Sequence, residues 1–380
     1  MTEFILTGPR GDNPLGFLTT LGALATLNDA GHQAWLAWNG VIPCLSAHIE
    51  AVERADTEEQ RHALLVNALH QRLQRRKSEH ATEIEQAKKE MERAKTALKK
   101  KSEEIRARKL DRATREHEVK ALRADLESKE AAFKKALLEG AADPSVALGK
   151  NLTVPGMELI AYIAAACEQA RLADRRWIDL AASYGLADPA SPEDRILTSP
   201  WALISGSGHQ DFLSSIESLM LECGAEHLRQ ALFGPWSPRD EKYSLRLDSA
   251  DDRRYALMDR DPTDGDNKPR TLWGANRLAF EALRFFPSVP IRRGMGVRAW
   301  RAGNGNWLEN CEVRWPLWEP PSQASSVHSV LGLRELWLDD LTARQRLKYL
   351  GVHTIMESRR IAAVKGKYYN LTPAAPVWVS

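Results

Sequence analysis

A long stretch without glycine or proline places the strongest limit on how this chain can fold. Between Thr57 and Glu139 neither residue occurs, and Ala, Glu, Lys, Arg and Leu, all good helix formers, make up most of the stretch. Thr57 and Gln60 form a capping box, in which each side chain satisfies a backbone amide at a helix start. The stretch therefore predicts a long helical segment that begins near residue 57.

Apolar side chains recur every seven residues inside this segment, a spacing typical of a coiled coil. The repeat comprises Ile84, Met91, Leu98, Ile105, Val119, Leu126 and Phe133, with Ala87, Ala94 and Leu122 at the neighbouring seam position. It fails where the seam is basic, at Lys101, Arg108, Arg112 and Arg115. A helical hairpin that reverses in this region would explain the failure, with Asp111 capping the returning helix.

We expect two antiparallel arms, from about Arg76 to Ala107 and from Arg112 to Gly140, each about 45 Å long. Because the turn contains no glycine, one unbroken helix about twice as long stays an alternative. A narrow seam and solvated outer faces leave no room for a catalytic pocket. We therefore expect this segment either to extend from the body and contact a distant partner, or to serve as a docking surface.

Basic residues are concentrated in the same segment. Between Gln71 and Lys135 there are 21 Lys and Arg residues against 13 Asp and Glu residues, a net charge of +8. The whole chain has 53 basic and 51 acidic residues, so the remainder carries a net charge of −6. This asymmetry fits a polyanionic partner, although Lys and Glu are also the common residues of any solvated helix face.

The residues on either side of the arm predict one globular body that the arm interrupts. We divide the chain into residues 1–56, the arm at 57–140, and residues 141–380. Asn13 as N-cap before Pro14 predicts a helix at 14–29. Asn39-Gly40 predicts a hairpin between strands at 33–38 and 41–45.

Further elements follow from the spacing of apolar residues in the C-terminal part. We expect a helix at 157–173 that is apolar enough to be buried, a β-hairpin near 295–317 around Gly303-Asn304-Gly305, a helix at about 331–349, and strands at 352–357 and 360–364. Strands and helices do not alternate, so a doubly wound sheet is not expected. The sequence predicts an α+β fold, predominantly helical, with an inserted long antiparallel helical hairpin (coiled coil).

Cysteine spacing and hydropathy set the expected compartment. The cysteines, Cys44, Cys167, Cys223 and Cys311, are spread singly, so we expect buried thiols rather than disulfides or a zinc site. The longest apolar runs fall short of the roughly 20 residues that a membrane span needs, and no signal segment opens the chain. We expect a cytoplasmic protein that has no membrane partner, metal or other cofactor.

A search for catalytic motifs finds no Walker loop, dinucleotide-binding glycine motif, metalloprotease motif or nucleophile elbow. One loop before Asp211 is a candidate phosphate cradle that uses backbone amides and a helix start. Its candidate residues are Ser205, Ser207, His209 and Gln210. A plain flexible connection with Asp211 as N-cap explains the loop equally well.

Carboxylates also gather between Asp248 and Pro262, as a two-metal nuclease would require. Three arginines are interleaved with them, which favours mutually paired surface charges. We therefore expect no catalysis at this cluster.

Two stretches combine cations with aromatic rings, as nucleic-acid grooves do. The candidate contacts are Arg292, Arg293, Arg298 and Arg301 in the first stretch, and Arg359, Arg360, Lys365, Lys367 and Tyr368 in the second. In the alternative interpretation the rings fill the core while the arginine heads reach solvent.

Four segments together resemble a known family. They are NPLGFLTTLGAL from Asn13, DDRRYAL from Asp251, GANRLAFEAL from Gly274 and RIAAVKGKYYNLTP from Arg360. The chain resembles proteins of type I-G (formerly I-U) CRISPR–Cas loci, namely the large-subunit-like proteins and a family described as an extension of the CRISPR helicase-nuclease. The resemblance covers both ends of the body, about two thirds of the chain, and leaves out the arm. The chain is also shorter than the large subunits.

The resemblance implies a non-catalytic subunit in RNA-guided antiviral defence, part of a Cascade-type effector complex. Such subunits recognise the duplex beside the target, help to open it and recruit the helicase-nuclease, while guide pairing reads the sequence. Guide RNA, target DNA, the effector backbone subunits and the helicase-nuclease would be the partners.

Two alternatives stay open. In one, a coiled-coil adaptor tethers or regulates the helicase-nuclease, or dimerises through the arm, without contacting nucleic acid. In the other, weaker one, an enzyme assembles its site from His209, Asp211 and distant carboxylates.

Overall fold

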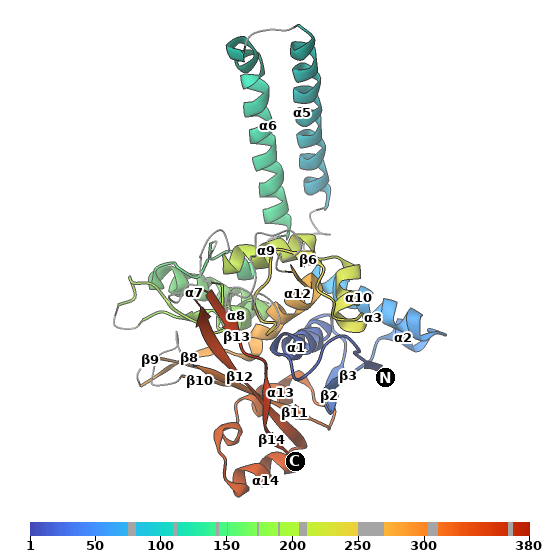
Figure 1. Ribbon diagram of the computed structural model, residues 1–380, viewed down its shortest axis with the longest axis vertical. Helices are drawn as coiled ribbons and strands as arrows, with labels where there is room; N and C mark the ends of the chain where they lie inside the picture. Colours follow the sequence, from blue (N-terminus) through green and yellow to red (C-terminus); the bar gives the residue numbers. More distant parts are fainter. Residues whose placement is uncertain are drawn as a thin grey trace. The chain divides into compact units, whose positions relative to one another are not determined.

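The computed structural model places the chain in the α+β class, with about 51% helix and 20% strand (Figure 1). It describes residues 1–74, 81–108, 112–141, 144–149, 151–172, 175–188, 191–204, 211–249, 270–292, 294–302, 311–363 and 368–380. The chain divides into two compact units. Unit 1 comprises Met1–Leu73 and Pro144–Ser380, and unit 2 comprises Gln74–Asp143. Within the described ranges, no helix has both the length and the apolar composition that crossing a bilayer requires.

Unit 1 contains most of the helices and all of the described strands. Its α-helices are α1 (Pro14–Asp29), α2 (Glu50–Glu53), α3 (Glu58–Leu73), α7 (Gly156–Leu172), α8 (Arg176–Ala181), α9 (Phe212–Glu222), α10 (Ala225–Phe233), α12 (Trp273–Ala282), α13 (Ala324–Leu331) and α14 (Leu341–Tyr349). Three short 3₁₀ segments join them: η1 (Pro144–Val146), η3 (Leu283–Phe285) and η4 (Arg334–Trp337).

The strands form two main antiparallel sheets and three small pairs. The first sheet has the order β1-β3-β2, from β1 (Thr2–Ile5), β3 (Ile42–Ala47) and β2 (Ala34–Asn39). The second has the order β10-β11-β12-β13, with β14 also paired to β12; its strands are β10 (Trp300–Arg301), β11 (Glu312–Trp318), β12 (Val352–Ala363), β13 (Tyr368–Leu371) and β14 (Ala375–Val379). The pairs are β4 (Gly185–Leu186) with β5 (Leu197–Thr198), β6 (Asp240–Glu241) with β7 (Arg270–Thr271), and β8 (Ser288–Ile291) with β9 (Gly294–Val297).

The predicted N-terminal elements are confirmed. Asn13 caps α1, because its side-chain oxygen accepts from the amides of Leu15 at 2.9 Å and Gly16 at 3.4 Å. The predicted hairpin joins β2 to β3, and Gly40 in its turn has a φ of +58°, which favours glycine. These signals are local in sequence, so tertiary contacts did not have to be known to find them.

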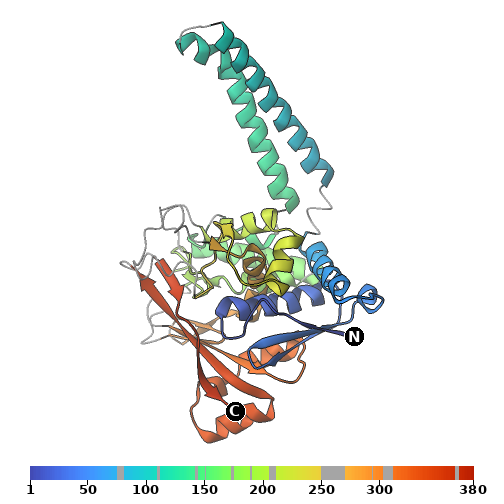
Figure 2. The ribbon, with the colours of Figure 1, turned by 45° about the vertical axis from the view of Figure 1, so that its right-hand side comes forward.

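Helix α1 is the centre of unit 1. It lies between the β1-β3-β2 sheet and α12, and its residues from Pro14 to Leu27 are all buried (Figures 1 and 2). The α1 and α12 backbones meet at Gly22, where a Cβ atom would lie 1.8 Å from the carbonyl oxygen of Leu278. No side chain fits in that gap, so this glycine sets how closely the two helices pack.

Helix α7 differs from its prediction. Only one stripe, which includes Leu159, Tyr162 and Ala166, is buried, whereas Met157 and Ile160 are about half exposed. The prediction of a fully buried helix is therefore wrong, because apolar content alone does not tell which faces a helix presents to a core. The prediction of buried thiols fails on the same helix, where Cys167 is exposed; Cys44 is only partly buried, while Cys223 and Cys311 are buried.

Three boundaries also differ from those predicted. The segment at 58–73, assigned to the arm, is α3 of unit 1, because Leu65, Val66 and Leu69 enter the core. The single helix predicted at 331–349 is divided into α13, η4 and α14, with Gly332 ending α13. The two strands predicted at 352–364 are one strand, β12. The turn Gly303-Asn304-Gly305 lies outside the described residues.

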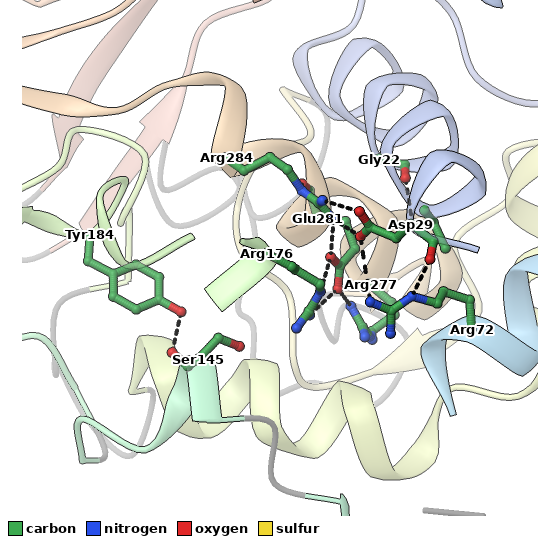
Figure 3. A network of polar contacts seen from close by, with 10 residues as sticks. Gly22, Asp29, Arg72, Ser145, Arg176, Tyr184, Arg277, Glu281 and Arg284 are labelled. Atoms are coloured by element: carbon green, nitrogen blue, oxygen red, sulfur yellow. Dashed lines mark hydrogen bonds and ion pairs between the residues drawn. The ribbon is translucent and has the colours of Figure 1, made fainter. Parts of the chain in front are cut away.

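A buried charge network joins four segments of unit 1 (Figure 3). The carboxylate of Glu281, 1% exposed, accepts from Arg176 at 2.5 and 2.7 Å, from Arg277 at 2.6 Å and from Arg284 at 2.8 Å. Arg284 also donates to the Asp29 carboxylate at 2.9 and 2.7 Å. Burial acts to raise the pKa of Glu281, but the attraction of these arginines outweighs it and holds that pKa well below its usual value.

Unit 2 contains α5 (Ala81–Ala107) and α6 (Arg112–Ala141), which lie side by side (Figures 1 and 2). Lys129 of α6 is 2.9 Å from Glu90 of α5, and Arg108 is 3.2 Å from Glu118, so the helices run in opposite directions. Between them, Ala94, Ile105 and Val119 are buried. These contacts describe two separate helices that pack against each other.

Replacing Gly22 by alanine should destabilise unit 1 by about 1 to 3 kcal/mol or more, because a methyl group would overlap the Leu278 backbone. Gly224→Ala is the matched control, since a Cβ atom there meets only His227 at 3.9 Å. Urea unfolding of both variants measures the difference. Equal midpoints for the two variants would contradict the packing described.

Replacing Glu281 by glutamine should lower the free energy of unfolding by about 3 to 5 kcal/mol, because buried arginines lose their counter-charge. Glu226→Gln is the control, since the pair of Glu226 with Arg229 is exposed and contributes less than about 1 kcal/mol.

The wild type should also show an acid dependence that the Glu281 variant lacks. Since the folded pKa of Glu281 is lowered, its contribution is present at neutral pH and is lost as pH falls below about 4.5 towards the folded pKa. A wild type and a variant with the same slope of stability against pH in this range would contradict the assignment.

Candidate nucleic-acid interface

The candidate residues that the structure describes come from the β8-β9 hairpin, the segment that follows it and the β10-β11-β12 sheet. Two of them form a row across that sheet with one carboxylate: Arg301 on β10 stands opposite Glu312 on β11, which stands opposite Arg359 on β12. Directly opposed side chains in an antiparallel sheet are close enough to interact. The sheet therefore brings together one arginine from each of the two predicted stretches, with a carboxylate between them.

Arg359 is exposed but shares its charge with two carboxylates. Its side chain is 62% exposed and lies 3.1 Å from Glu312 and 3.5 Å from Glu357. Such exposed pairs are weak, so a phosphate can compete for the guanidinium only against these neighbours. Arg359 can contribute to an anion contact at this position, but it does not add unbalanced positive charge.

Arg301 and Arg292 are exposed. The Arg301 guanidinium lies 6.0 Å from the centre of the Trp337 ring, and Arg314 lies over the same ring at 4.9 Å. Arg314 is further held by Glu357 at 2.8 Å. The contact with the Trp337 ring favours this orientation of Arg301 at the surface of the sheet.

Arg298 is directed into unit 1 rather than towards solvent. It donates to the carbonyl oxygen of Phe285 at 3.2 Å and lies 2.7 Å from Nδ1 of His328. Burial lowers the pKa of Arg298. Burial and the nearby Arg298 charge also lower the pKa of His328 to about 4, so this ring is neutral near pH 7 and can accept the hydrogen bond.

Arg360 is 5% exposed, on the inner side of β12. Its guanidinium stacks 4.0 Å from the centre of the Tyr369 ring, and burial lowers the pKa of Arg360. A role as a phosphate contact does not fit this position. The period-two alternation of the strand explains the difference, because successive residues point to opposite faces and Arg359 takes the outer one.

Several candidates lie outside the described residues. These are Arg293, Lys365 and Lys367 of the basic-aromatic stretches, the Tyr368 side chain, and Ser205, Ser207, His209 and Gln210 of the phosphate-cradle loop. The backbone of Tyr368 begins β13. Their roles stay predictions.

Trp337 contacts the candidate residue Arg301, Arg314 lies over the same ring, and the sequence patterns identified neither. Trp337 stands in a segment predicted as one continuous helix, and only its position in η4 places it over the sheet. Arg314 stood in a predicted strand, but its cross-strand partner Glu357 depends on the register of β11 against β12. The pairing of distant strands carries no local sequence signal.

Among the described residues, no three His, Cys, Asp or Glu side chains gather as metal ligands. A cavity of about 300 Å³ beside α14 has an apolar lining of Leu333, Leu347, Tyr349 and Leu350, with Arg346 and Glu335 at its edge. These two charges pair with each other at 3.2 Å.

Comparisons with protein-family models, with curated proteins and with solved structures found no match to this chain. The interpretation of its function therefore depends on the residues and contacts described above.

Replacing Arg360 by alanine should cost about 2 kcal/mol or more of stability, because the desolvated contact with Tyr369 and the buried stem are both lost. Arg359→Ala, one residue away, should cost less than about 1 kcal/mol. Thermal unfolding of the two variants separates the inner from the outer arginine. A larger loss for the Arg359 variant would reverse the assignment of the two faces.

Proposed function

We propose that this protein is a non-catalytic subunit of a type I CRISPR–Cas antiviral system, which binds guide RNA or target DNA together with partner Cas proteins and helps to recruit the helicase-nuclease. The observation that carries the proposal is that the described segments of the family resemblance meet in the core of unit 1. A chance likeness of short surface motifs would not require such contacts.

The first and third segments are the two helices that approach most closely. NPLGFLTTLGAL lies in α1 with its N-cap, and GANRLAFEAL lies in α12 and the start of η3. Gly22 of the first segment faces the Leu278 backbone of the third. Glu281, also in the third segment, holds the buried arginines. The resemblance therefore extends to residues that fix the packing of this fold.

The last segment joins the same core through the sheet. RIAAVKGKYYNLTP includes the end of β12 and all of β13, and β12 pairs with β11. Trp315 of β11 lies 5.6 Å from the Phe17 ring of α1 and donates to the carbonyl oxygen of Gly11 at 2.8 Å. The second segment, DDRRYAL, lies outside the described residues.

Within this proposal, exposed arginines of the β8-β9 hairpin and of the β10-β11-β12 sheet serve as phosphate contacts. Arg292, Arg301 and Arg359 are the described candidates, whereas the positions of Arg298 and Arg360 favour a structural role. Base pairing with a guide RNA would supply sequence specificity, so the protein itself needs backbone contacts rather than a base-reading site. Catalysis would belong to the helicase-nuclease.

The proposal includes unit 2 as an antiparallel coiled-coil hairpin inserted into the body. The ion pairs between α5 and α6 support it, as do the seven-residue seam positions, of which Ala94, Ile105 and Val119 are buried and Met91, Leu98 and Leu126 are half-buried. Such a unit can present charged outer faces to a partner while its seam keeps the two helices together.

Co-purification tests this function. The tagged full-length protein is expressed with and without the genes that neighbour its own, and the eluate at moderate salt is analysed for protein and nucleic acid. We expect effector backbone subunits and a guide RNA of uniform length in the first sample, and neither in the second.

Elution of the protein alone from the co-expression sample would contradict the proposal. Elution with only a helicase-nuclease, free of nucleic acid, would instead support the adaptor function. Treatment of the eluate with ribonuclease is the control, because subunits held only through a shared RNA would then separate.

A further inference from the structure

One face of α5 carries most of the exposed positive charge that the structure describes in unit 2. We define this basic face by its six residues, all exposed: Lys88, Lys89, Arg93, Lys95, Lys99 and Lys100. At 100° per residue they occupy a sector of about 160° outside the seam, and they extend about 18 Å along the helix. Glu92 lies within the same sector, so the face is a basic surface that contains one carboxylate.

The charges of the basic face are mostly not neutralised. Among the described residues, no carboxylate pairs with Lys88, Lys95, Lys99 or Lys100. Lys89 has only a distant partner, Glu85, at 3.8 Å. By contrast, Lys101 and Lys129 lie near the seam and pair with Glu118 and Glu90. The seam cations stabilise the helix pair, which leaves the outer cations for a partner.

The exposed side of α6 carries fewer described cations. Its exposed described charges are Glu116, Lys120, Arg123, Asp125, Glu127 and Glu130, of which two are basic. On α5 the six cations of the basic face stand against five exposed carboxylates, Glu83, Glu85, Glu92, Glu103 and Glu104. Most of the exposed described cations of unit 2 therefore gather on one sector of α5.

We propose that the basic face of α5 binds the phosphate backbone of double-stranded nucleic acid without reading its sequence. Lysine supplies a mobile point charge suited to phosphate, and several lysines in a row neutralise several phosphates together. The interaction deepens the proposed function, on which it rests, by adding a duplex contact on unit 2 to the phosphate contacts proposed for the exposed arginines of unit 1.

A protein partner fits this face less well. Protein interfaces are depleted in lysine and depend on apolar or aromatic anchors. The other residues of this sector are Glu92 and Thr96, neither of which provides such an anchor. Single-stranded nucleic acid also fits less well, because its binding depends on aromatic rings that stack bases, and the basic face has none.

The experiment measures binding of the full-length protein to a fluorescent duplex of about 30 base pairs of arbitrary sequence at several salt concentrations. The test variant combines Lys88→Gln, Lys95→Gln and Lys99→Gln, which lie along one line of α5. The control variant combines Lys120→Gln, Arg123→Gln and Lys348→Gln, which remove the same net charge from α6 and α14. All six positions are exposed, and glutamine is a good helix former, so both variants should fold.

For the wild type we expect the logarithm of affinity to fall with the logarithm of salt with a slope of about −4 to −5. The test variant should flatten this slope by about 2 to 3 units and lose about a hundredfold in affinity near 0.1 M salt. The control variant should stay within about threefold of the wild type. A single strand of the same length should bind more weakly than the duplex.

Equal losses in the two variants would overturn the inference, as would a loss of affinity without a change in slope or a preference for the single strand. The inference would also be overturned if the wild-type protein showed no binding to the duplex but bound an acidic protein. Co-purification of the test variant separates the two proposals. If guide RNA and backbone subunits still elute with the test variant while its duplex binding equals that of the wild type, only this inference fails. If the wild-type protein binds the duplex but co-purifies with no effector subunit or guide RNA, only the proposed function fails.

Discussion

The close approach of α1 to α12 at Gly22 determines much of what unit 1 can be. Because the Leu278 backbone occupies the space of a side chain at this position, α1 is buried on all sides between helices and sheet. A helix in that environment needs apolar or small residues all round, and Thr19 and Thr26 satisfy their hydroxyl groups on carbonyl oxygens of the preceding turn. The same contact aligns the C-terminal ends of both helices, where Asp29 and Glu281 meet the buried arginines.

The buried charges around Glu281 explain why the core, besides being apolar, packs in one specific arrangement. Glu281 is fully desolvated, which would be costly for an isolated carboxylate, yet arginines from α8, α12 and η3 all donate to it. Removing Glu281 would take the shared counter-charge from three buried arginines, and a shifted register of the helices would break several of these pairs at once. The network therefore favours one packing of these segments over similar alternatives. The contacts of the network therefore describe a structural role.

The sequence predicted the elements whose signals are local. Asn13 and Pro14 marked the start of α1, and Asn39-Gly40 marked a hairpin, because capping and turn chemistry involve only neighbouring residues. The predictions failed where tertiary contacts decide whether a helix joins the core and which face it buries. Helix α3 joins the body through three buried side chains, and α7 leaves apolar residues exposed on one side. For the candidate interface, composition identified Arg359 and Arg360 together. Only the register of β12 separates an outer cation from one stacked on Tyr369.

The central claim is a division of labour, in which unit 1 supplies a rigid body and the basic face of α5 contacts a duplex. Lysine acetylation of the full-length protein, with and without a duplex, tests this claim most directly, because mass spectrometry reports each lysine separately. The account predicts that the duplex protects Lys88, Lys95 and Lys99, while the exposed Lys348 of α14 and Lys120 of α6 react equally in both samples. Protection of Lys348 or Lys120, with the lysines of α5 unchanged, would contradict it.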